Sequence, residues 1–91
     1  MDAQLHADLT THFARYFEAV DSYDLDAIAA ILDGATLNLR GTEVSGPAIR
    51  QLYADVQPAP LEDGRRQTKH HPANLLVEGP DEDGWYTATI Y

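Results

Sequence analysis

Residues 16–26 read YFEAVDSYDLD, and this stretch decides the fold because it ends one predicted helix and starts another. Upstream of residue 21, the apolar residues recur at steps of three or four with one adjacent pair, which places them on one helix face. They are Leu5, Leu9, Phe13, Tyr16, Phe17 and Val20. The side-chain oxygens of residues 21–24 bond backbone groups locally, which ends this helix. Asp24 is then the predicted N-cap of a second helix, and the two helices form a hairpin.

The rest of the chain adds strands and a third helix. The second helix covers residues 25–32, and the alternation at 35–40, broken by Gly41 before 42–44, predicts a short strand pair. Pro47 follows a capping position and starts a third helix that ends before Pro58.

The C-terminal third predicts a hairpin of two long strands. An extended stretch at residues 65–78 is joined to a strand at 85–91 by an acidic turn. The order of elements predicts an α+β domain with helices on one face of an antiparallel sheet. Because residues 1–91 end inside an alternating strand, we expect a single domain that is incomplete at its C-terminus or borrows strands from a partner.

The composition excludes several classes of function. Six Lys+Arg and fifteen Asp+Glu in 91 residues give a formal net charge of −9. This charge repels phosphate backbones and anionic lipids, so we expect neither a nucleic-acid nor a membrane partner. The absence of cysteine excludes disulfides, thiolate metal sites and cysteine nucleophiles. We find no targeting signal, and a cytoplasmic location is the simplest expectation.

Four short motifs together resemble a known family. They are residues 16–26, the strand at 35–37, the helix start at 46–49 (GPAI) and the segment at 68–74 (TKHHPAN). In this order they resemble the SnoaL-like branch of the nuclear transport factor 2-like superfamily. The resemblance implies a cone-shaped curved antiparallel sheet, a cystatin-like α+β barrel, with three helices of the N-terminal half on its concave face. It also implies further strands beyond residue 91 and a homodimer.

The turn at residues 21–24 (DSYD) is similar to that of the scytalone dehydratases. Carried over residue by residue, this likeness implies that Tyr23 faces the substrate and that Asp24 orients His70, the acid/base catalyst. The family's carbonyl-polarising tyrosine falls on Gly41 here. We therefore expect acid/base chemistry of the same kind rather than scytalone dehydration itself.

His70 and Asp24 also have ordinary structural interpretations. A histidine beside a carboxylate can shuttle a proton without a cofactor, but a strand histidine can equally bond only to backbone. Asp24 can be the helix cap alone, or it can cap with one oxygen and contact His70 with the other. We expect Asp21 to be a solvated helix-end residue. The alternative is that it points into a pocket, because an acid at a helix C-terminus opposes the dipole and needs another reason to be there.

Other residues complete the predicted site. Strand alternation places Asn74 on the same face as His70. Aromatic residues form core by default, and Tyr16 and Trp85 are assigned to the wall of a pocket for a small planar ligand. We expect no metal, because adjacent strand histidines such as His70 and His71 point to opposite faces.

The sequence thus predicts a cofactor-independent acid/base enzyme. We expect a dehydratase, isomerase or cyclase that acts on a small aromatic or polyketide-like carbonyl compound. Two alternatives stay open. One is a non-catalytic ligand-binding or oligomerisation module, similar to the small subunit of ring-hydroxylating dioxygenases, and the other is a protein-binding adaptor.

Overall fold

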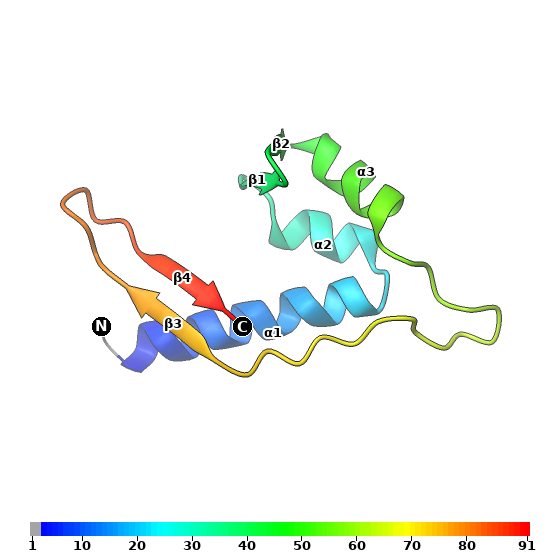
Figure 1. Ribbon diagram of the computed structural model, residues 1–91, viewed down its shortest axis with the longest axis horizontal. Helices are drawn as coiled ribbons and strands as arrows, with labels where there is room; N and C mark the ends of the chain where they lie inside the picture. The colour runs from blue at the N-terminus through cyan, green and yellow to red at the C-terminus, as the bar shows by residue number, and fades with distance from the viewer. Residues whose placement is uncertain (1–2) are drawn as a thin grey trace.

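The computed structural model describes residues 3–91 as three helices and two short hairpins (Figure 1). The helices are α1 (Ala3–Asp21), α2 (Leu25–Ile31) and α3 (Pro47–Val56). The strands are β1 (Thr36–Leu39), β2 (Thr42–Ser45), β3 (Leu75–Glu78) and β4 (Thr87–Ile90). The predicted α+β class and the three helices are therefore confirmed.

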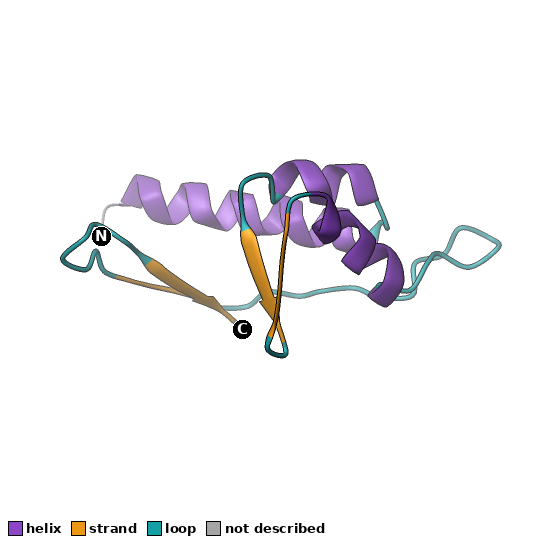
Figure 2. Ribbon diagram, turned by 90° about the horizontal axis from the view of Figure 1, so that it is seen from above, coloured by secondary structure: helices purple, strands orange, loops and turns teal. Residues whose placement is uncertain are grey.

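The helices form one layer, and both hairpins extend to the same side of it (Figure 2). The β1–β2 pair is antiparallel, with Leu37 opposite Val44, and the β3–β4 pair is antiparallel, with Val77 opposite Ala88. Within residues 3–91 the two hairpins form separate two-stranded sheets and no closed barrel. These residues therefore do not show the cone-shaped barrel that the family resemblance implies.

Local sequence signals explain where the N-terminal elements begin and turn. Asp24 caps α2 as predicted, because its Oδ1 accepts a hydrogen bond from the backbone N–H of Ala27 at 3.1 Å. Pro47 occupies the first turn of α3, where its missing N–H has no intrahelical partner to lose. Arg40 and Gly41 both have positive φ, 53° and 88°, as a tight two-residue hairpin turn requires.

The apolar core joins the three helices. Ala19 and Val20 of α1 pack with Ile28 of α2, whose side chain is 0% exposed, and Ile49 of α3 is also buried. Half-buried side chains surround this cluster: Tyr16, Leu25, Ala27, Ile31, Leu32 and Tyr53. The C-terminal end of the predicted α1 stripe thus faces the core, which stabilises the helical hairpin by removing apolar surface from water.

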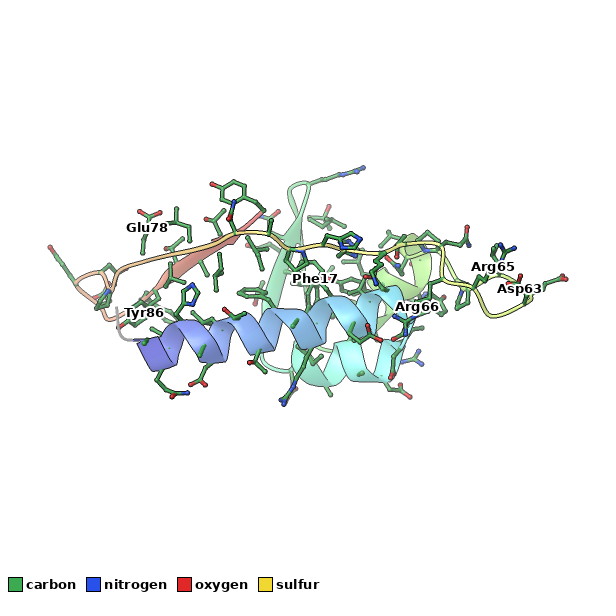
Figure 3. The ribbon with its side chains drawn as sticks, turned by 90° about the horizontal axis from the view of Figure 1, so that it is seen from below. Phe17, Asp63, Arg65, Arg66, Glu78 and Tyr86 are labelled. Carbon is green, nitrogen blue, oxygen red and sulfur yellow. The ribbon has the colours of Figure 1, made fainter. Side chains whose placement is uncertain are left out.

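Residues 57–74 differ from the sequence prediction. They form neither helix nor strand, whereas the sequence predicts an extended strand over residues 65–78. Of that stretch, β3 pairs with β4, and two backbone hydrogen bonds of 3.1 Å join Ala73 and Asn74 to Tyr91. The segment first projects away from the helices, with Asp63 and Arg65 paired at 2.6 Å near its tip, and then runs back along α1 (Figures 1 and 3). We call residues 66–70 the strap.

None of the helices described for residues 3–91 is both long and apolar enough to cross a bilayer.

Candidate functional site

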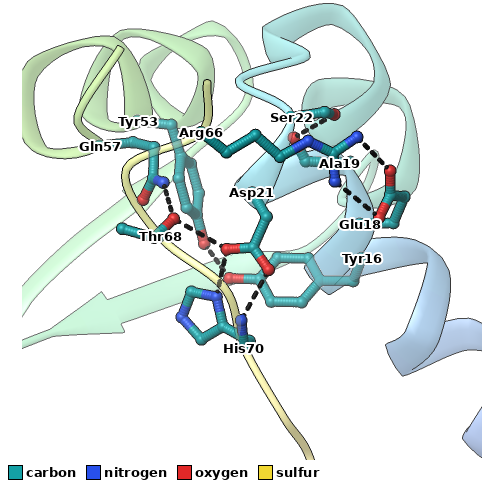
Figure 4. A network of polar contacts seen from close by, with 10 residues as sticks. All are labelled: Tyr16, Glu18, Ala19, Asp21, Ser22, Tyr53, Gln57, Arg66, Thr68 and His70. Carbon is teal, nitrogen blue, oxygen red and sulfur yellow. Dashed lines mark hydrogen bonds and ion pairs between the residues drawn. The ribbon is translucent and has the colours of Figure 1, made fainter. Parts of the chain in front are cut away.

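The strap crosses the end of α1 at Asp21, whose side chain is only 6% exposed (Figure 4). Oδ1 of Asp21 accepts hydrogen bonds from the Thr68 hydroxyl at 2.8 Å and from Nδ1 of His70 at 2.6 Å. Oδ2 accepts from the backbone N–H of His70 at 2.7 Å. Three donors from the strap thus meet one carboxylate on the helix.

These donors keep Asp21 ionised. Burial by itself raises the pKa of Asp21, but the hydrogen bonds from the His70 backbone, the Thr68 hydroxyl and the His70 ring lower it further than burial raises it. The net pKa lies below the ordinary value, and the donors also offset the unfavourable position of an acid at a helix C-terminus. Because an ionised carboxylate only accepts hydrogen bonds, Nδ1 of His70 carries the proton between them.

The ring of His70 is held from two directions. It stacks on Phe17, with ring centroids 4.9 Å apart and an interplanar angle of 24°, and its Nδ1 is fixed by Asp21. When the ring is neutral, the Nδ1–H tautomer leaves a lone pair on Nε2. Nε2 makes no hydrogen bond within residues 3–91, and the side chain is 43% exposed. His70 is therefore oriented by two neighbours, and its second ring nitrogen has no hydrogen-bond partner within residues 3–91.

His70 lines a hollow of about 370 Å³ between α1, β1 and α3. The other residues of its wall are Tyr16, Val20, Leu37, Asn38, Leu39, Leu52, Tyr53, Val56 and Gln57. Most of this wall is apolar or aromatic, and the volume falls at the lower end of the range for small-molecule sites. A larger hollow of about 940 Å³ shares Leu39, Leu52, Val56, Gln57 and His70 with this wall.

Two tyrosine hydroxyls are paired in this wall. The hydroxyl of Tyr16 is hydrogen-bonded to that of Tyr53, and the rings meet edge to face with centroids 6.3 Å apart. Burial raises the pKa of Tyr16, and the hydrogen bond and charge of Tyr53 raise it further, so Tyr16 stays protonated. One O–H is used inside the pair, so the other keeps its proton for a second hydrogen bond.

The predicted contact between Asp24 and His70 is wrong. Asp24 is an exposed helix cap, and the carboxylate that contacts Nδ1 of His70 belongs to Asp21. The expectation that Asp21 is solvated is also wrong, because Asp21 is buried. The physical reason is that the strap crosses the last turn of α1, where Asp21 lies, rather than the start of α2.

The structure brings one of the four predicted substrate-binding residues, Tyr16, to the hollow beside His70. Tyr23 instead donates its hydroxyl to the carbonyl of Ala54 at 3.4 Å, which links the α1–α2 turn to α3. Asn74 lines a separate hollow of about 310 Å³ between α1 and the β3–β4 hairpin. Trp85 is 73% exposed in the turn before β4. Strand alternation misplaced Asn74 because residues 70–74 do not form a regular strand, so their side chains do not keep the two-residue alternation.

Several residues of the site were not assigned from the sequence. Phe17 and Tyr53 were treated as core, and Thr68 and Gln57 were given no role. The spacing of Thr68 and His70 was the available signal, because side chains two residues apart in an extended segment point the same way. In residues 3–91, no three or more His, Cys, Asp or Glu side chains gather in a group that could hold a metal ion.

Comparisons with protein-family models, curated proteins and solved structures find no match to this chain. A functional proposal therefore draws on the geometry of Asp21, His70 and the hollow beside them. Beside this geometry, the sequence motifs supply a resemblance to a known family.

Proposed function

We propose that this protein is a cofactor-independent acid/base enzyme, a dehydratase, isomerase or cyclase, that acts on a small aromatic or polyketide-like carbonyl compound. The observation that carries the proposal is the 2.6 Å contact between Asp21 and Nδ1 of His70 at the edge of an apolar hollow. Membership of the SnoaL-like branch, with its cone-shaped sheet and homodimer, belongs to the same proposal and is supported by the sequence motifs.

In this mechanism His70 moves a proton and the tyrosine pair stabilises the negative charge. Nε2 takes a proton from the carbon next to the substrate carbonyl, and Asp21 stabilises the imidazolium that forms. The electron pair of the broken C–H bond passes into an enolate, whose oxygen accepts a hydrogen bond from Tyr16 or Tyr53. His70 then returns the proton to another carbon, to a departing hydroxyl that leaves as water, or to the oxygen of a second carbonyl that the enolate attacks.

Hydrogen–deuterium exchange at carbon tests this proposal without knowledge of the natural substrate. A small aryl ketone such as 2-tetralone is incubated with the protein in D₂O, and loss of the α-proton signal is followed by NMR. We expect His70→Ala and Asp21→Asn each to lower the protein-dependent exchange rate by about 10²-fold or more.

Two neighbouring residues provide matched controls. Asp24→Asn retains a good helix cap, and His71→Ala removes a histidine adjacent to His70, so both should exchange at the wild-type rate. An unchanged rate in His70→Ala would exclude His70 as the base. An equal loss in Asp24→Asn and Asp21→Asn would mean that general destabilisation, not the contact with His70, explains the effect.

A non-catalytic oligomerisation module is the second candidate, and exposed apolar side chains favour it. Leu76, Trp85, Tyr86 and Tyr91, in and around the β3–β4 hairpin, are 43–73% exposed. Several exposed apolar groups on one hairpin favour an interaction surface, and a second copy of the chain is the proposed partner. Light scattering tests for the dimer. Dimerisation and ligand binding without any ketone exchange would favour this module over the enzyme.

A further inference from the structure

Behind the contact of Asp21 with His70 lies a chain of hydrogen bonds that reaches α3 (Figure 4). The side-chain amide of Gln57 donates from Nε2 to the Thr68 hydroxyl at 2.8 Å, and this hydroxyl donates to Oδ1 of Asp21 at 2.8 Å. The same Oδ1 lies 2.6 Å from Nδ1 of His70. Gln57 is itself anchored, because its backbone N–H caps α3 by donating to the carbonyl of Tyr53 at 2.9 Å.

The direction of each hydrogen bond in this chain follows from chemistry. An ionised carboxylate can only accept, and a threonine hydroxyl has a single proton to donate. If the Gln57 amide presented its oxygen to Thr68, two acceptors would compete for that one proton. With the amide nitrogen toward Thr68, every group is satisfied, and the Thr68 proton is directed at Asp21.

We infer that Thr68 and Gln57 are positioning residues. Together they direct a hydrogen bond at Oδ1 of Asp21, which fixes the carboxylate against Nδ1 of His70 and so holds the ring in the Nδ1–H tautomer. This role rests on the proposed acid/base function, since it matters only if Nε2 of His70 must be free to take a proton. Gln57 and Tyr53 line the same hollow as His70, so the C-terminal end of α3 positions both the hydrogen-bond chain and one of the paired tyrosines.

Few other charges act on Asp21. Besides His70, the charged groups whose fields reach it are Glu18 and Arg66, and these two form a bidentate pair at 2.7 and 3.1 Å. A substitution at Thr68 changes neither of these two groups. A change in the titration of Asp21 on substitution of Thr68 therefore reports the lost hydrogen bond rather than a change in surrounding charge.

The test compares Thr68→Val, which keeps the side-chain shape but removes the hydroxyl, with Thr68→Ser, which keeps the hydroxyl. Carboxyl ¹³C NMR follows the titration of Asp21, and the ketone exchange assay follows turnover. We expect Thr68→Val to move the midpoint of Asp21 upward and to slow exchange about tenfold, with Thr68→Ser close to wild type in both. Gln57→Leu should shift the midpoint in the same direction but less, because the hydroxyl keeps its proton and loses only its fixed direction.

Two controls separate positioning from general effects of substitution. Thr87→Val changes an exposed strand threonine, and Gln51→Leu removes a glutamine on α3 that bonds to exposed Asp55 at 2.8 Å. Neither should move the Asp21 midpoint. An unmoved midpoint in Thr68→Val, or failure of Thr68→Ser to preserve the wild-type midpoint, would overturn the inference even if the protein exchanges ketone protons. A shifted midpoint in a protein that exchanges no ketone would support the hydrogen-bond chain and reject the enzyme proposal.

Discussion

The three helices and the segment from residue 57 onward are held in place by different forces. The buried residues of the described chain are Ala19, Val20, Asp21, Ile28 and Ile49, and all lie in α1, α2 or α3. Residues 57–91 contain no buried residue, and their strap is tied to α1 by polar contacts with Glu18 and Asp21. The candidate site lies where the two regions meet, with Asp21 from one and His70 from the other. The site therefore depends on hydrogen bonds more than the core does.

Ile28→Ala is the substitution that we expect to destabilise the helical region most. Because Ile28 is 0% exposed and its neighbours come from two helices, the cavity left behind should lower the free energy of unfolding by about 2–5 kcal/mol. Urea denaturation followed by circular dichroism measures this loss. Leu61→Ala, at a 43% exposed position in the projecting loop, should change the unfolding free energy by less than about 0.5 kcal/mol. Similar losses for both would mean that packing is not concentrated in the helices.

The helical region could be predicted because its signals are local. The apolar stripe ending at Val20, the cap at Asp24 and the proline at residue 47 each act within one or two helical turns, and the structure confirms each element. The sequence predicts one extended stretch over residues 65–78 that pairs with residues 85–91, and the strap lies in the part of it that does not pair. Whether an extended segment pairs depends on partners distant in sequence, and within residues 3–91 only residues 73–78 of this stretch find one.

Asp21→Ala should loosen the strap from α1, with a smaller loss of unfolding free energy than Ile28→Ala. It removes the acceptor of three hydrogen bonds, and we expect about 1–3 kcal/mol lower free energy of unfolding. The sharper readout is amide hydrogen exchange at His70, whose backbone N–H donates to Asp21 and should lose its protection.

A matched substitution shows whether this effect is specific. Asp26→Ala removes an exposed carboxylate that pairs with Arg50 at 3.0 Å, far along the chain from the strap. Exchange at the His70 amide should be unchanged in that variant. If Asp21→Ala leaves the His70 amide as protected as in the wild type, the strap is held by something other than this carboxylate.

The site was only partly predictable for a related reason. His70 was identified from its residue type and motif, but the choice between Asp21 and Asp24 depends on where the strap crosses α1. The local preference of Asp24 for a cap is satisfied by Ala27, which leaves no reason for it to contact His70. Asp21 opposes the dipole of its own helix, and such an unfavourable charge is itself a sign that donors lie nearby.

Acidification should weaken the contact between Asp21 and the strap, and we expect its effect on the free energy of unfolding to be the smallest of these changes. The folded-state pKa of Asp21 lies below the ordinary value of 3.8. At pH values between the folded-state and the unfolded-state pKa, the unfolded chain therefore binds more protons than the folded chain. Stability from Asp21 is therefore complete above about pH 5 and is lost as the pH falls through the folded pKa. Urea unfolding at a series of pH values, for the wild type and for Asp21→Asn, isolates this contribution as a difference curve. The lowered pKa of Glu18 has the same sign, and Glu18 is unchanged in both proteins, so its effect cancels in the difference. We expect the difference to shrink toward low pH. A difference that grows on acidification would show that burial of Asp21, rather than the donors of the strap, sets its protonation.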